Sequence, residues 1–499
     1  MKIKKLLIIN ILIYFSHLLQ AQIIMDRTKF IEQITNQYDS YKEVALKDRR
    51  FKHTDLQLLI EKLKSHSLFH ISLLGKSVEG RDISLITLGT GKTKVLLWSQ
   101  MHGDESTATM ALFDIFNFFA QQDEFDDLKK DWLSKVTLYC IPMLNPDGAE
   151  AWKRRNAYEI DLNRDAIRLQ SPEAVILKAI RDSLNPEFGF NLHDQSIFYT
   201  VGNTPQPATI SFLAPAFNYE KDINEVRGRA MKLIAELTET LHQFIPKQIA
   251  KYNDDFEPRA FGDNIQRWGT SVILIESGGY PDDPEKQYIR KMNFIALITG
   301  IFSIANKNWQ KYSIAQYEAI PFNERLLKSL IMRNLSLKKN NKDYKVDVAY
   351  LYGEVGIDNE RNFYYKNVID EIGDLSIYYG YQEVDCNGMT GEEGKVYPKK
   401  FGSLAEVKKL NLKDLYKEGY TSVVVEKEKI KEEFTTLGIN ILLNTDKRYK
   451  KVGSPLAAMG KNPDIVIRQN GKVRYVVING FIQDVDKEEN SILNALVYK

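Results

Sequence analysis

Cysteine is scarce in this sequence. Among 499 residues only Cys140 and Cys386 carry a thiol, and they lie far apart. A disulfide framework cannot be argued from two cysteines. Cys140 stands in the apolar run 136–143, where a buried thiol behaves as a small hydrophobic side chain. We therefore expect Cys140 to be structural, and whether it pairs with Cys386 stays open at this point.

A strong charge of either sign is also missing. The formal net charge is +2, and Lys2, Lys4 and Lys5 belong to an N-terminal segment that we expect to be removed, which leaves about −1. No electrostatic argument for a nucleic-acid partner remains. Hydrophobic residues make up 43% and charged residues 27% of the chain. These values disfavour both a disordered chain and a protein with many membrane spans.

One apolar run, from Leu6 to Phe15, follows these lysines directly. It precedes Leu19-Gln20-Ala21, which has the small residue of a cleavage site. We expect residues 1–21 to be a signal peptide and the protein to be exported, either periplasmic or secreted. The alternative is a retained membrane anchor, but the run is shorter than the roughly 20 residues of a span and Asn10 interrupts it. No stable membrane span is expected after signal removal.

The next three fifths of the chain alternate between helical and extended patterns. Helical spacing over 26–65 is followed by strand-like alternation over 70–98, in which Gly89-Thr90-Gly91 predicts a hairpin turn. Apolar runs typical of buried strands then end at polar residues; they span 95–99, 136–143, 188–192 and 271–275. Strands that alternate with helices predict an α/β domain with a mixed sheet. Ligands and catalytic groups collect at such strand ends.

The composition changes from about Ile314, where Lys, Asn, Tyr and Glu become frequent. Within this second region, 464–467 and 472–473 flank Asn470-Gly471, which predicts a β-hairpin. We therefore divide the mature chain into a first domain over 22–313, with a helical lead-in, and an accessory region over 314–499. The accessory region is predicted to be α+β or rich in strands, and no motif in it indicates a function.

Two histidines and a glutamate form the first candidate site. His102 and Glu105 are three residues apart where a strand gives way to a helix, so one short segment can offer two ligands to one ion. A solvated loop would show the same spacing. A catalytic zinc site needs three protein ligands and an open position. His193, which follows a strand-like run, can be the third.

Arginines and one more glutamate complete the set of candidates. Arg154-Arg155-Asn156 and Asp161-Leu162-Asn163-Arg164 concentrate guanidinium groups that suit recognition of a carboxylate or of an oxyanion, although a solvated basic loop is the alternative. Glu276 ends the apolar run 271–275. Burial there would raise the pKa of Glu276 and prepare the residue to accept a proton. If the strand end faces solvent instead, its pKa keeps the usual value.

The order of these motifs, from His-x-x-Glu through Arg-x-Asn and Asp-x-Asn-Arg to a strand His and a strand Glu, resembles the carboxypeptidase A-like zinc metallopeptidases. The resemblance runs from Ile71 to Tyr280 and begins with Gly75-Lys76-Ser77-Val78-Glu79-Gly80-Arg81. It implies a mixed-sheet α/β catalytic domain with helices on both faces. It also implies a zinc-dependent enzyme that hydrolyses the C-terminal bond of a peptide or peptide-like substrate with a free carboxylate.

The resemblance assigns a role to each matching position. It makes His102, Glu105 and His193 ligands of Zn²⁺, Glu276 the general base, Arg154 the group that polarises the carbonyl, Asn163 and Arg164 the holders of the terminal carboxylate, and Asp161 the carboxylate that orients His102. Arg155 replaces Arg154 if the loop is shifted by one residue.

Two departures from the family concern specificity. Its mobile tyrosine has no clear counterpart beyond Tyr252, and the segment between Glu105 and His193 is shorter than in the digestive enzymes. The same site could also act on cell-wall peptides. A peptide-binding protein that has lost catalysis is a further alternative, although it should have lost a ligand or the base.

Overall fold

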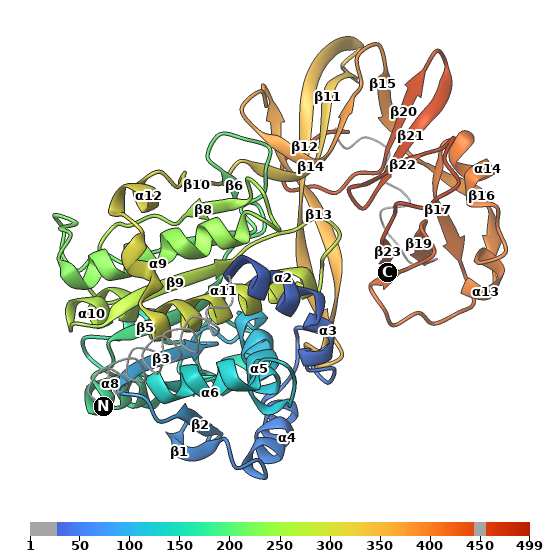
Figure 1. Ribbon diagram of the computed structural model, residues 1–499. Coiled ribbons are helices and arrows are strands. Elements are labelled where there is room, and N and C mark those ends of the chain that lie inside the picture. The colour runs from blue at the N-terminus through green and yellow to red at the C-terminus, as the bar shows by residue number, and fades with distance from the viewer. Residues whose placement is uncertain (1–26, 444–455) are drawn as a thin grey trace, which may run out of the picture.

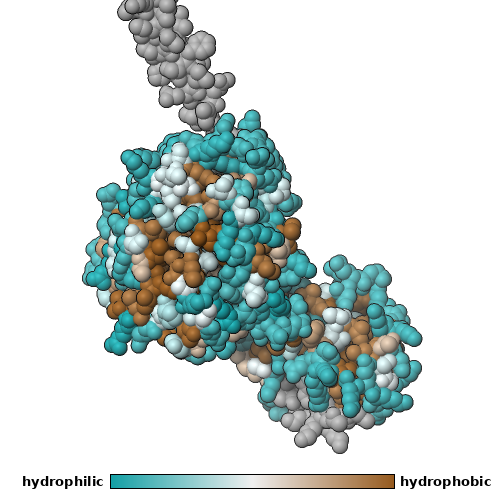
Figure 2. All heavy atoms as spheres, turned by 90° about the horizontal axis from the view of Figure 1, so that it is seen from below, coloured by the Kyte–Doolittle hydropathy of each residue, from teal (hydrophilic) through white to brown (hydrophobic). Residues whose placement is uncertain are grey.

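The computed structural model describes residues 27–443 and 456–499, so the expected signal peptide lies outside the described residues. The chain forms a larger body, built from its N-terminal three fifths, and a smaller body that holds the C-terminal strands (Figure 1). Seen from below, the two bodies meet at a narrower waist, and apolar residues gather in patches on both (Figure 2).

A mixed sheet of eight strands forms the centre of the larger body. Its order is β1-β2-β4-β3-β5-β9-β7-β8. The strands β1, β3, β4, β5 and β9 run in one direction, whereas β2, β7 and β8 run in the opposite direction. The strands are β1 His70–Lys76, β2 Asp82–Gly89, β3 Thr93–Ser99, β4 Val136–Ile141, β5 Phe188–Asp194, β7 Ile210–Leu213, β8 Ile249–Lys251 and β9 Ser271–Ser277. The short strand β6 (Thr200–Val201) pairs with β10 (Asn323–Glu324) outside this sheet.

Helices cover both faces of this sheet, as the resemblance implies. One face packs against α2 Arg27–Asn36, α3 Tyr38–Tyr41, α4 His53–Lys64, α5 Thr107–Ala120, α6 Asp126–Lys135, α9 Glu225–Leu241 and α11 Gln287–Asn306. The other packs against α8 Pro172–Leu184, α10 Phe261–Arg267 and the short helix η1 Leu162–Arg164. The helix α7 (Pro146–Ala151) follows β4. The prediction of an α/β domain is confirmed.

The helix α11 is long and apolar enough to cross a membrane, but 83% of its apolar 18-residue window is buried inside the protein. It therefore has the surroundings of a core helix.

The turn at Gly89-Thr90-Gly91 corrects one expectation. It joins β2 to β3, but the two strands do not pair, because β4 lies between them. A Cβ atom on Gly91 would come within 1.8 Å of the backbone of Lys135, the residue that precedes β4. The glycine is therefore needed for close approach of a third segment and not for a hairpin.

The core of the larger body extends slightly beyond the expected boundary at residue 313. After η2 (Asn308–Lys311), helix α12 (Ile314–Glu318) packs on α9, and Tyr317 and Ile320 are buried in the same core. These apolar side chains complete the face of α9.

The accessory region contains two sheets. The larger has the order β13-β12-β11-β15-β20-β21-β22, with β14 paired to β11, and the smaller has the order β16-β17-β19-β23-β18. Their elements are β11 Leu327–Lys339, β12 Lys342–Ile357, β13 Asn362–Gly373, β14 Tyr379–Asp385, β15 Thr390–Glu393, β16 Lys395–Phe401, α13 Leu404–Val407, α14 Leu412–Lys417, β17 Tyr420–Val425, β18 Phe434–Thr435, β19 Asn440–Leu443, β20 Ile465–Gln469, β21 Lys472–Ile478, β22 Phe481–Asp484 and β23 Ala495–Tyr498. The predicted strand-rich character is confirmed.

Two smaller expectations in these regions can also be compared with the structure. The hairpin between β20 and β21 turns through Asn470 and Gly471, whose φ angles are +52° and +77°, as an Asn-Gly turn requires. Cys140 and Cys386 are both free and buried, in different hydrophobic cores. Burial raises the pKa of both thiols, so they serve as packing groups.

Arg49 and Arg50 join the two bodies. Their guanidinium groups lie between the rings of Trp152 in the larger body and Phe363 in β13, with the guanidinium carbons 4.9 to 5.6 Å from the ring centres. Both also pair with Glu354 of β12. Although the two arginines are charged, they are buried.

A buried ion pair inside the larger body gives a test of its stability. Arg290 and Asp114 are fully buried, and the carboxylate of Asp114 also accepts hydrogen bonds from the Tyr38 hydroxyl and the Glu43 backbone. The variant Arg290→Met should lower the free energy of unfolding by about 3–5 kcal/mol, because it leaves a buried carboxylate without its cation.

Thermal or denaturant unfolding followed by circular dichroism measures this loss. The control is Lys64→Met, which removes an exposed ion pair with Glu61 and should cost less than about 1 kcal/mol. Equal effects of the two changes would contradict the assignment.

Candidate metal centre

Three neighbouring strands bring the candidate residues to one edge of the sheet. His102 and Glu105 lie in the loop between β3 and α5, His193 lies in β5, and Glu276 lies in β9. Because β5 and β9 are parallel, His193 and Glu276 stand opposite each other in the register. Segments separated by up to 174 positions in the sequence thus converge, as the strand-end pattern predicts.

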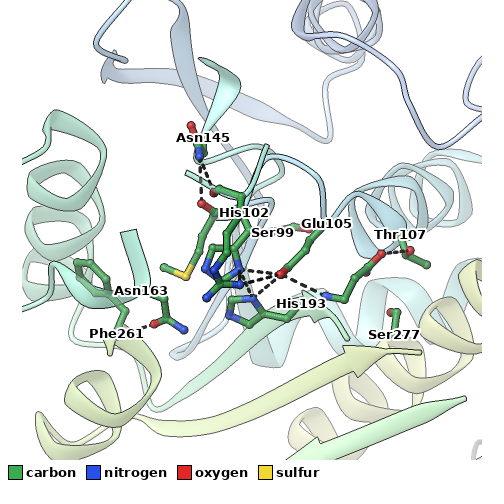
Figure 3. Close-up of polar contacts among 12 residues, drawn as sticks. Ser99, His102, Glu105, Thr107, Asn145, Asn163, His193, Phe261 and Ser277 are labelled. Atoms are coloured by element: carbon green, nitrogen blue, oxygen red, sulfur yellow. Dashed lines mark hydrogen bonds and ion pairs between the residues drawn. The ribbon is translucent and has the colours of Figure 1, made fainter. Parts of the chain in front are cut away.

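The donor atoms of His102, Glu105 and His193 all lie within 4.8 Å of one another, and the three residues are buried. Glu105 joins the two imidazoles: its Oε1 is 2.8 Å from Nδ1 of His102, and its Oε2 is 2.7 Å from Nδ1 of His193. The two Nδ1 atoms are 3.2 Å apart. Figure 3 shows both rings and the carboxylate pointing toward the same position.

Asp161 contacts His102 on the side of the ring opposite the donor group, and this contact leaves Nδ1 able to bind a metal. Nε2 of His102 lies 3.2 Å from Oδ1 of Asp161. A hydrogen bond from Nε2–H to that carboxylate leaves the Nδ1 lone pair directed at the donor group, which is how a carboxylate prepares a histidine to bind a metal. Two imidazole nitrogens and one carboxylate are a donor set that suits zinc. The residues present therefore fit a zinc ion.

Burial and charge act in opposite directions on the two glutamates. Burial alone would raise the pKa of Glu105, but the imidazoles of His102 and His193 outweigh it and hold this pKa below its usual range. Burial raises the pKa of Glu276 well above its usual range, and the charges of Glu105 and Asp194 add to the effect. Glu105 thus stays ionised, whereas Glu276 holds a proton more readily.

Arg154 faces the donor group, and Arg155 does not. Nη1 of Arg154 lies 3.0 Å from Nδ1 of His102 and 3.2 Å from Oε1 of Glu105, while its Nε donates to Asp161 at 3.0 Å. Arg155 instead donates to the backbone of Glu159 at the surface. The structure therefore favours Arg154 over the alternative in which the loop is shifted by one residue.

Asn163 and Arg164 lie on η1, beside the donor group. The side-chain oxygen of Asn163 accepts a hydrogen bond from the backbone of Phe261 at 2.9 Å, which leaves its amide group free to point toward the site. Nε of Arg164 pairs with Glu257 at 3.2 Å. In Figure 3, Asn163 and Phe261 lie to one side of His102 and His193, and Thr107 and Ser277 lie to the other.

Tyr252 follows β8 and lies near the site. Burial raises the pKa of its hydroxyl, and the charges of Glu276 and Glu105 add to the shift. Its ring stands edge-on to that of Tyr199, with the ring centres 6.3 Å apart. The position that the sequence offered for the family's tyrosine is thus close to the proposed base.

The sequence analysis missed a buried ion pair beside the donor group. Nζ of Lys286 lies 3.0 Å from Oδ2 of Asp194 and donates to the backbone oxygen of Ser277 at 3.0 Å. Asp194 also accepts from the hydroxyl of Thr107 at 2.6 Å, and its backbone N–H donates to Glu105. The position of Asp194 next to His193 was a usable signal, but no sequence pattern marks Lys286.

The chain is similar to known carboxypeptidases. Residues 57–232 match the family model described as zinc carboxypeptidase. Carboxypeptidase 2 of Trichophyton tonsurans is 26% identical over 214 residues, which are 40% of this chain and 36% of that protein. Carboxypeptidase SOL1 of Arabidopsis thaliana is 32% identical over 98 residues, 18% and 20% of the two chains. The family match confirms the resemblance that the motifs indicate.

A solved metallo-carboxypeptidase of Burkholderia cenocepacia superposes with a TM-score of 0.43 and 18% identity, over 52% of this chain and 70% of the other. The chain spans between a fifth and two fifths of the length of the first curated relatives that it matches.

Metal binding can be tested at His193 directly. The variant His193→Ala should lose most of the bound metal, because two of the three donors cannot hold a zinc ion in a catalytic geometry. Elemental analysis of the purified protein after dialysis against zinc gives the metal content per chain. The exposed His66 supplies the matched control His66→Ala, and equal zinc content in the two variants would remove His193 from the site.

Proposed function

We propose that this protein is an exported zinc-dependent carboxypeptidase that removes the C-terminal residue of a peptide, because residues 57–232 match the family model described as zinc carboxypeptidase. One observation carries the proposal: the donor atoms of His102, Glu105 and His193 converge within 4.8 Å, and Glu276 stands opposite His193 on the next strand. Export rests on the N-terminal lysines and apolar run alone.

The chain's own side chains divide the chemistry among them. His102, Glu105 and His193 would hold the metal, and Asp161 keeps His102 in the required tautomer. Zinc, when bound, acts as a Lewis acid on the carbonyl and lowers the pKa of coordinated water towards about 7. Glu276 would take a proton from the attacking water as the oxygen of that water bonds to the carbonyl carbon. It would then pass this proton to the amide nitrogen as the bond between the carbonyl carbon and that nitrogen breaks.

Arg154 has the second catalytic role. Its side chain is 42% exposed, and its guanidinium group contacts Asp161 through one nitrogen and His102 through another. A fixed cation in this position can donate hydrogen bonds to the carbonyl oxygen as that oxygen gains negative charge. Since Arg154 is partly exposed, a substrate can reach it from the solvent side.

Recognition of the free carboxylate would fall to Asn163 and Arg164. Asn163 lies to one side of the donor group (Figure 3), and Arg164 is the next residue of η1. Arg164 pairs with Glu257, which also pairs with Arg259. A substrate carboxylate can replace Glu257 as the partner of Arg164, and Glu257 then keeps Arg259 as its own partner. The domain division into a catalytic part and an accessory region is part of the same proposal.

Removal of the base should separate catalysis from metal binding. Glu276→Gln should keep the zinc of the parent protein and lose about two to four orders of magnitude in kcat, because a neutral amide cannot accept the proton. Hydrolysis of a blocked C-terminal dipeptide, with zinc content measured on the same sample, tests this. Parental turnover in the Gln variant would show that another group is the base.

The carboxylate contact gives an independent test. Arg164→Met should lower kcat/KM for a blocked dipeptide with a free carboxylate about 10- to 100-fold, mainly through KM, because one charge-assisted contact is lost. The slow hydrolysis of the same dipeptide amide should not change. Arg259→Met, which removes the other partner of Glu257, is the matched control. An equal loss on ester-blocked or amidated substrates would contradict this role.

A further inference from the structure

A cleft of about 1210 Å³ leads from the candidate site to the accessory region. One wall belongs to the larger body and includes Glu105, Asp194 and Lys286. The opposite wall belongs to the accessory region and includes Tyr352, Tyr365 and Phe481. The strand-rich region, for which the sequence indicates no function, therefore continues the surface that begins at the metal donors.

The two walls are fixed to each other beside the site. The hydroxyl of Tyr381, from β14, donates to the backbone oxygen of Ile197 at 2.6 Å, in the loop that follows His193. A Cβ atom on Gly279, three residues after Glu276, would lie 2.3 Å from the same hydroxyl. One tyrosine of the accessory region thus contacts the loops that follow the third metal donor and the proposed base.

Aromatic rings form a continuous row along the cleft. Phe198 of the larger body packs edge-on against Tyr352, with ring centres 5.3 Å apart. Tyr352 packs on Tyr365 at 4.6 Å, and Tyr365 contacts Phe481 at 6.2 Å. All four rings line the cleft. Such a row can pack against the aliphatic part of long side chains and attract a cation at their ends.

The charged groups around these rings are mostly acidic. Nine lining residues are Asp or Glu and three are Lys or Arg. Several are neutralised by ion pairs, such as Glu354 by Arg49 and Asp194 by Lys286. Among lining charges that form no ion pair within the described ranges, four are acidic and one is basic; they are Asp104, Asp282, Asp283, Glu489 and Lys487. The cleft therefore favours a positively charged occupant.

The position of the cleft decides which part of a substrate it can receive. Asp194 and Lys286, at its inner end, hydrogen-bond to Thr107 and Ser277. Figure 3 places Thr107 and Ser277 across the donor group from Asn163. If Asn163 and Arg164 hold the terminal carboxylate, as the proposed function states, the chain that precedes the cut bond crosses the donors and enters the cleft.

We propose that the cleft binds the segment of a peptide substrate that precedes the cut bond, and that it prefers lysine or arginine in that segment. This inference rests on the proposed carboxypeptidase function and adds a substrate class to it. The accessory region then acts as a specificity-determining wall of the active site.

The test compares substrates that reach the cleft with one that does not. A blocked dipeptide occupies only the catalytic site and does not reach the cleft. Blocked pentapeptides with the same last two residues extend into the cleft, and they carry Lys, Gln or Glu at their first two positions. In the parent protein, kcat/KM should fall in the order Lys, Gln, Glu. The Lys preference should shrink at high salt, since screening weakens contacts between solvated charges.

The variant for this test neutralises two lining carboxylates far from the metal donors. Asp282→Asn combined with Glu489→Gln keeps side-chain size and should reduce the Lys-to-Gln ratio of kcat/KM about fourfold, roughly twofold per charge at about 8 Å in water. The matched control combines Asp48→Asn with Glu220→Gln, which lie outside the cleft lining. That control should leave the ratio as in the parent.

The outcomes separate this inference from the proposed function. If the dipeptide is not hydrolysed, the carboxypeptidase function itself is wrong. If the dipeptide is hydrolysed but the pentapeptides show no Lys preference, or the cleft variant keeps the parental ratio, the cleft proposal is overturned. Faster hydrolysis of a sugar-linked cell-wall peptide than of the Lys pentapeptide would also overturn it, because the rings would then serve a saccharide.

Discussion

The carboxylate of Glu105, shared between the imidazoles of His102 and His193, is the contact on which the rest of the site depends. Each oxygen faces one Nδ1 atom, at 2.8 and 2.7 Å. A buried carboxylate is costly unless cations or hydrogen-bond donors surround it. This requirement explains the neighbouring groups: Arg154 and the backbone of Asp194 donate hydrogen bonds to Glu105. A divalent cation would satisfy the same carboxylate more fully, together with both imidazoles.

Much of the larger body could be predicted because the patterns that indicate its strands and donor residues lie within short segments of the sequence. The apolar runs 95–99, 188–192 and 271–275 end at or beside donors, and in parallel strands such ends meet at one edge of the sheet. The turn at Gly89–Gly91 could not be predicted in the same way. Whether two consecutive strands pair depends on whether a third strand comes between them, and β4 is formed by residues almost fifty positions later.

The groups that the sequence did not reveal share one property: their partners are distant in the chain. Lys286 has no motif around it, and its role beside Asp194 appears only when α11 packs next to β9. Tyr381 likewise lies in a region without motifs, although its hydroxyl reaches the loop that follows His193. Local sequence patterns identify the candidate metal donors and the candidate base, whereas the residues that hold them in position can be identified only from the three-dimensional structure.

Temperature acts differently on the two kinds of contact that hold this molecule together. Apolar packing, which forms both cores of the larger body, weakens on cooling. The bridge formed by Arg49 and Arg50 relies on paired carboxylates and aromatic faces, and the cost of desolvating its charges falls as the temperature rises. Warming therefore lowers the cost of burying the two arginines that connect the bodies, whereas cooling weakens the apolar packing inside the larger body.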